Sequence, residues 1–222
     1  MKNPLYLQQL LLGPMQNFVY LIGSHTTREA LVVDPAWDLD AIVNQADADD
    51  MKLIGALVTH YHPDHVGGDL FGHSIAGLRE LLERRAVPIH VHRVEADGVR
   101  QVTGVGAHDL VLHDGGDHIA IGDLDLTLLH TPGHTPGSQC FLVNGNLVSG
   151  DTLFIRGCGR VDLPGSDPEQ MYHSLTSVLN KLPDDTVLYP GHDYADKPTS
   201  TLGAEKRENP TCACPACASG WR

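Results

Sequence analysis

Long hydrophobic runs and basic residues are both scarce in this sequence. None of its 222 residues belongs to an apolar stretch that approaches the roughly 18 residues of a membrane-spanning helix. Lysine and arginine total 15 against 28 aspartates and glutamates, which gives a formal net charge of -13. Nucleic-acid binding needs a basic footprint against phosphate, and docking on an anionic membrane needs positive charge as well, so neither partner is expected.

A secretion signal is not expected either. The first residues, MKNPLYLQQLLLGP, hold a short apolar run broken by Gln8 and Gln9, with no small-residue cleavage site, and they predict a first strand. The five cysteines are an odd number, which without a secretion signal favours reduced thiols in the cytoplasm over a disulfide framework. The 14 histidines stand out, because histidine is the commonest metal ligand.

Predicted strands and helices occur in mixed order. Hydrophobic content is 41 %, enough for a sizeable core. Apolar runs bounded by Gly, Pro or Asp predict strands near residues 5–12, 17–23, 30–34, 52–60 and 87–92, and helical spacing predicts helices over 38–50 and 76–85. From residue 108 the pattern is strand-rich, up to a helix over 167–182 with Asp167 as N-cap and a last strand over 186–192.

This order predicts an α+β sandwich of β-sheets with helices packed outside, folded as one domain over residues 1–210. Residues 211–222 form a tail that contains Cys212, Cys214 and Cys217. Three thiols at this spacing could hold a zinc ion with a fourth ligand from elsewhere. The alternative is an irregular tail whose thiols oxidise.

Three histidines and an aspartate crowd into the stretch VTHYHPDHVGG, residues 58–68. Side chains alternate along a strand, so His60 and His62 should point to the same side where a buried strand ends. Pro63 cannot extend the sheet, so the chain should turn there and aim Asp64 and His65 separately. The spacing offers two pairs of ligands to two points in space, whereas the alternative interpretation is a solvated polar loop.

The same local design occurs three more times. In LHTPGHTPGS, LVSGDTLF and LYPGHDY an apolar run halts at glycine and presents His134, Asp151 and His192 respectively. If these loops converge on one sheet edge, the four loops together supply five histidines and two carboxylates. Nitrogen and oxygen ligands without thiolate suit zinc, iron or manganese.

In this order the four motifs resemble the metallo-β-lactamase superfamily, and the likeness runs from about residue 5 to 210. The resemblance implies a four-layer αβ/βα sandwich, two mixed β-sheets flanked by helices, with metals at one edge between the sheets. It implies one metal on His60, His62 and His134, a second on Asp64, His65 and His192, and Asp151 as the bridge. Asp64 and Asp151 are the predicted catalytic carboxylates. Asp34 either orients a ligand histidine or is a turn residue before proline.

Two metals account for hydrolysis without a serine or cysteine nucleophile. Metal binding lowers the pKa of water to about 7, so a metal-bound hydroxide can attack a carbonyl while the metal stabilises the oxyanion. The stretch GDTLFIRGCGRVDLPGSDPEQMYHSL is similar to glyoxalase II, the hydroxyacylglutathione hydrolases, and to the related persulfide dioxygenases. We therefore expect a thioesterase with two zinc ions and a small thioester or thiol-derived substrate, such as a glutathione conjugate.

The alternative function is oxidation of glutathione persulfide. Such a dioxygenase would use one Fe2+ held by His60, His134 and Asp151, with open positions for O2 and a thiol substrate. Lactone or β-lactam hydrolysis is a less favoured branch. Full-length glyoxalase II carries an additional helical C-terminal domain that binds glutathione, which this chain is expected to lack, so the substrate stays open.

Two residues near the predicted site are candidates for substrate binding. Arg160 either contacts an anionic substrate or pairs with Asp162, and Tyr194 either hydrogen-bonds substrate or packs. Cys158 is expected to be a small buried residue near the site. A homodimer is the default assembly for such an enzyme.

Overall fold

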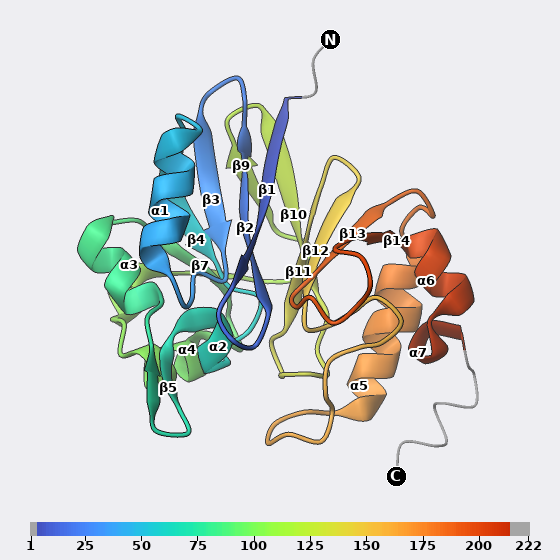
Figure 1. The fold of residues 1–222 in the computed structure, drawn as a ribbon. Helices are drawn as coiled ribbons and strands as arrows, with labels where there is room; N and C mark the ends of the chain where they lie inside the picture. Colours follow the sequence, from blue (N-terminus) through green and yellow to red (C-terminus); the bar gives the residue numbers. More distant parts are fainter. Residues whose placement is uncertain (1–3, 214–222) are drawn as a thin grey trace.

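Two six-stranded β-sheets form the centre of the computed structural model, which describes residues 4–213 (Figure 1). The first sheet has the order β1-β2-β3-β4-β7-β8, formed by Leu5–Leu12, Asn17–Ser24, Glu29–Val33, Lys52–Leu57, Ile89–His92 and Leu110–His113. The second has the order β14-β13-β12-β11-β10-β9, formed by Ser200–Thr201, Val187–Pro190, Asn146–Gly150, Gln139–Val143, Leu124–His130 and His118–Ile121. Both sheets are mixed, because β3, β4, β7 and β8 run parallel in the first and β12 and β13 in the second.

Helices cover the outer face of each sheet. The helices before the second sheet are α1 (Leu39–Ala48), α2 (Pro63–Val66), α3 (Leu78–Arg84) and α4 (Ala96–Thr103), and those within and after it are α5 (Pro168–His173), α6 (Leu202–Glu208) and α7 (Pro210–Ala213). Figure 1 shows α1 and α3 on one side of the molecule and α5 and α6 on the other, with the strands between them. The predicted four-layer α+β sandwich is therefore confirmed.

Three hydrophobic cores separate the four layers. They form because successive side chains of one strand point to opposite faces of its sheet. Along β2, Val19 and Leu21 face a core shared with α1, α3 and α4, whereas Tyr20 and Ile22 face the core between the sheets. Along β11, Phe141 enters the core between the sheets and Cys140 faces the helices of the second half. Strands buried on both faces explain the nearly continuous apolar runs of the sequence.

The structure differs from the sequence-based expectations in several elements. The helix predicted over 167–182 begins as expected, with Asp167 accepting from the backbone N–H of Glu169 and Gln170, but its α-helical part ends at His173. A wider turn (Ser174–Val178) and a 3-10 turn (Leu179–Lys181) follow it. Helix α4 was not predicted.

The segment after α2 forms a small hairpin of β5 (Gly68–Leu70) and β6 (His73–Ile75). At Pro63 the chain turns as expected and forms the short helix α2, which ends at Val66 with Gly67 as its C-cap. The backbone from Pro210 to Ala213 is helical where an irregular tail was expected. Cys214 and Cys217 lie outside the described residues, as does the side chain of Cys212, so the proposed role of these thiols stays a prediction.

Candidate metal centre

The four predicted ligand loops meet at one edge of the sandwich. His60 and His62 follow β4, Asp64 and His65 lie in α2, His134 follows β10, Asp151 follows β12, and His192 follows β13. The loops of the two halves touch, because the N–H of Gln139 donates to the carbonyl of Thr59. All these side chains are buried or nearly so, and His62 is the most open of them.

Glycine is required where these loops pass each other. Gly150 has φ +49°, and a Cβ there would lie 2.6 Å from Thr59 of the opposite half. At Gly191 a Cβ would collide with Oδ1 of Asp151. The pattern in which each strand halts at glycine therefore lets the backbones approach closely around the ligand side chains.

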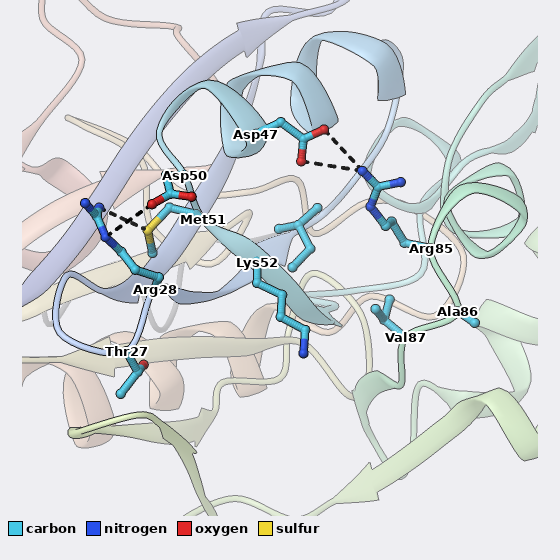
Figure 2. Close-up of a pocket in the computed structure, with 10 residues that line it drawn as sticks. Thr27, Arg28, Asp47, Asp50, Met51, Lys52, Arg85, Ala86 and Val87 are labelled. Atoms are coloured by element: carbon cyan, nitrogen blue, oxygen red, sulfur yellow. Dashed lines mark hydrogen bonds and ion pairs between the residues drawn. The ribbon is translucent and has the colours of Figure 1, made fainter.

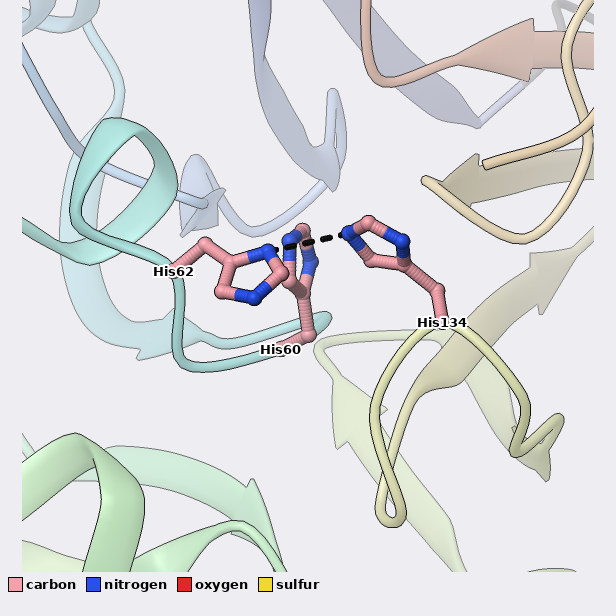
Figure 3. Close-up of side chains that lie close together, drawn as sticks. All are labelled: His60, His62 and His134. Carbon is pink, nitrogen blue, oxygen red and sulfur yellow. Dashed lines mark hydrogen bonds between the residues drawn. The ribbon is translucent and has the colours of Figure 1, made fainter. Parts of the chain in front are cut away.

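The first group consists of His60, His62 and His134, which Figure 3 shows turned toward one another. One ligand atom from each lies within 4.8 Å of the others. Nδ1 of His62 is 2.9 Å from Nε2 of His134. Nε2 of His60 is buried and has no hydrogen-bond partner among the described residues.

The second group consists of Asp64, His65 and His192, again within 4.8 Å of one another. Nε2 of His65 lies 3.2 Å from Nε2 of His192 and 3.3 Å from Oδ2 of Asp64. All three side chains are buried, so their polar atoms meet one another away from solvent.

Asp151 stands between the two groups. Its Oδ2 lies 3.5 Å from Nε2 of His134, in the first group. Its Oδ1 lies 3.4 Å from Nε2 of His65 and 3.5 Å from Nε2 of His192, in the second. The two oxygens of one carboxylate thus face the two groups of nitrogens.

Hydrogen bonds to the other ring nitrogen orient four of the histidines. Nδ1 of His60 lies 3.0 Å from Oγ1 of Thr59, and Nδ1 of His65 lies 2.9 Å from Oδ2 of Asp34. Nδ1 of His134 is 2.8 Å from the carbonyl of Arg160, and Nδ1 of His192 is 2.9 Å from the carbonyl of Met15. A proton on Nδ1 donated to these acceptors leaves the lone pair of Nε2 pointing inward, as metal ligation requires.

The charges of the site favour ligation as well. Burial lowers the pKa of His60 well below its ordinary value, and burial together with His134 lowers the pKa of His62 to about 4. Burial opposes ionisation of Asp151, yet the nearby His65 and His192 lower its pKa to about 2. For His65, burial is outweighed by Asp64 and Asp151, which raise its pKa, so the two carboxylates favour a positive charge here that a metal ion could supply in place of the proton.

This set of residues fits metal ions. Two nitrogens that both hold a tetrahedral zinc at about 2.0–2.1 Å are roughly 3.3 Å apart, close to the separations found here. The 2.9 Å between Nδ1 of His62 and Nε2 of His134 is a hydrogen-bond distance when one of the two nitrogens is protonated, and the same two nitrogens can bind one cation when neither is. Nε2 of His60 and Oδ1 of Asp151 are further possible ligand atoms, because both are buried and make no hydrogen bond to the described residues.

Asp34, which the sequence suggested as a residue that orients a ligand histidine, contacts the site at His65 and at Thr59. Besides His65, it accepts from the backbone N–H of Thr59 at 2.7 Å and from Oγ1 of Thr59 at 2.5 Å. Thr59 in turn contacts His60. Asp34 has a φ of +52°, an uncommon conformation for a non-glycine residue that is typical of strained functional positions.

Sequence reasoning missed two polar residues at the site. Glu95 is 1 % exposed and accepts from the N–H of Tyr61 at 2.9 Å, the N–H of Gly137 at 2.6 Å and Oγ1 of Thr135 at 2.9 Å. It therefore ties the loop of His60 and His62 to the loop of His134. Asn17 donates to Oδ2 of Asp64 at 3.0 Å. Neither residue belongs to a motif, so no local signal could have identified it.

The two candidate substrate residues lie beside a cavity of about 670 Å³ that opens above the ligand residues. Arg160 pairs with Asp162 through two contacts of 2.9 Å, as one of the two interpretations predicts. Tyr194 stacks on His192 at a ring distance of 4.6 Å, and partial burial together with the nearby Asp151 and Asp64 raises its pKa to about 12. Cys158 also lines the cavity and is half-buried.

A second hollow, of about 700 Å³, lies where β4 begins at Lys52 (Figure 2). The metal centre follows the other end of this strand, about 20 Å away for six residues. Two of the hollow's cations are paired, Arg85 with Asp47 at 3.2 Å and Arg28 with Asp50 at 4.0 Å. Among the described residues that line it there is no histidine, and none belongs to a group that could hold a metal ion.

Within residues 4–213, no helix combines the length and apolar composition needed to cross a membrane. Lipid-spanning helices are therefore not part of the described structure.

Comparison with known proteins agrees with this geometry. Human mitochondrial persulfide dioxygenase ETHE1 is 32 % identical over 211 residues, which cover 93 % of this chain and 76 % of that protein. The cytoplasmic hydroxyacylglutathione hydrolase of Arabidopsis thaliana is 36 % identical over 188 residues, covering 82 % of this chain and 65 % of the relative. The crystal structure of ETHE1 from Myxococcus xanthus superposes with a TM-score of 0.78 at 32 % identity, covering 96 % of this chain and 85 % of the other.

The family itself is identified by a match over residues 12–192, which contain all seven predicted ligands. With this match, the resemblance inferred from the four motifs is confirmed. The chain belongs to the metallo-beta-lactamase superfamily.

Proposed function

We propose that this protein is a hydrolase that cleaves thioesters with two divalent metal ions, zinc in the first instance. The observation that carries the proposal is the pair of complete three-residue groups with Asp151 between them. A site for one metal would not require the second group to converge. The name of the Arabidopsis relative, a hydroxyacylglutathione hydrolase, supports the thioester class.

In this proposal His60, His62 and His134 would hold one metal, and Asp64, His65 and His192 would hold the other. Asp151, which stands between the two groups, would be a ligand of both. When bound, the metals lower the pKa of a water molecule to about 7 and polarise the substrate carbonyl. The net reaction adds water to the thioester, breaks the C–S bond, and yields a carboxylic acid and a thiol.

The chain's own residues prepare that reaction. Asp34 and the carbonyls of Arg160 and Met15 fix the rings of His65, His134 and His192. Asp64 lines the cavity and is held by Asn17, and its carboxylate, whose pKa His65 and Asn17 keep low, would bind metal and accept a hydrogen bond from the attacking water. Tyr194, on the cavity wall, donates its hydroxyl proton in a hydrogen bond to the substrate, and the Arg160 side chain lies beside the leaving thiol.

The second candidate is persulfide oxidation, favoured by the 32 % identity to human ETHE1 and the similar crystal structure from Myxococcus xanthus. It would use one iron on His60, His134 and Asp151. In that case His62, Asp64, His65 and His192 would support the site without binding metal.

Two assays separate these candidates. Zinc-loaded protein should hydrolyse S-lactoylglutathione or another acyl thioester, and absence of turnover with all of them contradicts the first proposal. Iron-loaded protein should be tested for O2 uptake with glutathione persulfide. One iron per chain as isolated, together with O2 uptake, would establish the second candidate instead.

A cytoplasmic location and a homodimer complete the proposal. The Arabidopsis relative is named as cytoplasmic and the human one as mitochondrial, so fractionation of the source cells is the appropriate test of location. Sedimentation of the purified protein tests the dimer.

A further inference from the structure

The walls of the cavity above the metal centre are mostly apolar. Met15 lies in the turn between β1 and β2, Leu70 and Phe71 belong to the β5–β6 hairpin, and Phe154 and Leu163 follow β12. They come from three separate segments, yet they surround one opening. The polar groups of the lining are concentrated at the metal-binding floor, in His62, Asp64, His134, Asp151 and His192.

Large apolar side chains at the mouth of this cavity are exposed to solvent. Phe71 is 95 % exposed, Tyr194 58 % and Met15 37 %. Phe71 also has a φ of +53°, which is a strained conformation for a bulky residue. An exposed aromatic side chain on a strained residue at the tip of a hairpin does not stabilise the fold. Contiguous exposed apolar surface is typical of a binding site.

Positive charge is almost absent from the same walls. Among the described residues that line the cavity, Arg160 is the one lysine or arginine, and both of its contacts go to Asp162. A glutathione moiety carries two carboxylates and would meet one cation that is already neutralised. The -13 net charge of the chain repels such an anion further.

We propose that the substrate is an acyl thioester with an uncharged aliphatic acyl chain, which lies against Phe71, Leu70 and Met15, and that glutathione is not specifically selected as the thiol. This inference rests on the proposed thioester hydrolysis and narrows its substrate class. Each methylene that the cavity buries strengthens binding about fourfold. Affinity should therefore grow with chain length and depend little on the carrier.

Binding of uncleavable thioethers to the metal-loaded protein tests the inference by calorimetry. The probes are S-ethyl, S-butyl, S-hexyl and S-octyl derivatives of neutral N-acetylcysteamine and of glutathione. We expect Kd to fall at least tenfold from ethyl to hexyl, with the glutathione series no more than tenfold tighter. A smaller gain with length, or a larger preference for glutathione, overturns the inference.

Two matched variants test where the acyl chain of the substrate binds. Phe71→Ser should reduce the gain from ethyl to hexyl at least threefold, because it removes the apolar wall at the mouth. Val111→Ser makes a similar change at another exposed apolar residue, on edge strand β8, and should leave the gain unchanged. Equal gains in wild type and Phe71→Ser would overturn the placement of the acyl chain.

The binding assay does not depend on turnover, so the two proposals fail separately. Length-dependent binding without hydrolysis of any thioester contradicts the proposed function alone. Hydrolysis of S-lactoylglutathione without length-dependent binding contradicts the inference alone.

Discussion

Oδ2 of Asp34 lies 2.9 Å from Nδ1 of His65, and both side chains are almost completely buried. The bond fixes the ring so that Nε2 faces His192 and Asp64, and it raises the basicity of that nitrogen. The residue is therefore expected to control metal binding without touching the metal.

Asp34→Asn should weaken binding of the second metal about 10- to 100-fold, the usual range for such outer partners. The affinity should fall because an uncharged amide accepts hydrogen bonds from His65 and Thr59 more weakly than the carboxylate does. Titration against a chelating zinc indicator measures the affinity. Asp123→Asn is the matched control, since Asp123 also accepts two side-chain hydrogen bonds, from Ser24 and Thr26, far from the site. Unchanged affinity in Asp34→Asn would refute this role.

Glu95→Gln should loosen the first metal group. The buried carboxylate joins the backbone between His60 and His62 to the loop of His134, whereas a glutamine would turn one amide N–H toward an existing donor. We expect about tenfold weaker binding of one metal, measured by elemental analysis after dialysis. Burial raises the pKa of Glu95, so keeping its carboxylate charged costs stability. In Glu95→Gln the free energy of unfolding should therefore fall less than the free energy of metal binding.

Glu205→Gln provides the comparison for Glu95. Glu205 is also buried and accepts from Ser200, Asn209 and the N–H of Arg156, but it holds no histidine loop. Both metals should remain bound in this variant. If both glutamine variants lose metal equally, Glu95 contributes only to general stability.

His192→Gln distinguishes the two proposed functions by counting metal ions. If the protein binds two metals, the count should fall from two ions per chain in the wild type to one in the variant, and most thioesterase activity should be lost. With one iron on His60, His134 and Asp151, the count should stay at one and O2 uptake should continue. His118→Gln, which changes an exposed histidine paired with Asp125, should leave every count unchanged.

Acid should destabilise the protein through His90, which is not one of the candidate metal ligands. Burial and the adjacent His113, whose Nε2 lies 2.9 Å away, lower the pKa of His90 from 6.5 to about 4. The folded state then binds fewer protons than the unfolded state between these values, so stability is present above pH 6.5 and is lost as the pH falls to 4. At about 1.36 kcal/mol per pKa unit the loss from this residue is at most roughly 3 kcal/mol.

Urea unfolding at several pH values measures this effect. His90→Gln should flatten the decline between pH 6.5 and pH 4 relative to wild type, while His108→Gln, at an exposed histidine, should not. A parallel decline in wild type and His90→Gln would show that His90 does not contribute. The comparison between variants removes any common effect of metal release.

Much of this structure could be predicted because its signals are local. The strand runs, the Asp167 cap and the four ligand loops each occupy a few consecutive residues, and their order identified the superfamily. Gly98 shows why helix α4 escaped prediction: a Cβ there would lie 2.8 Å from the ring of Tyr61, so tertiary contact selects a residue that disfavours helix. Likewise, the bond from Oγ of Ser174 to the carbonyl of Pro132 lies where α5 gives way to the wider turn. Such pairings, like Asn17 with Asp64, join distant parts of the chain and leave no periodic trace.

The candidate ligands are divided between the two sheets, so the core between the sheets positions the two parts of the site relative to each other. His60, His62, Asp64 and His65 belong to the first half, and His134, Asp151 and His192 to the second. Ligand distances are thus a measure of how the sheets are docked. Tyr20 and Phe141 lie in the core between the sheets, and the hydroxyl of Tyr20 donates to the carbonyl of Pro190, two residues before His192. Loss of packing volume in this core should therefore shift the distances between ligand atoms as well as lower stability.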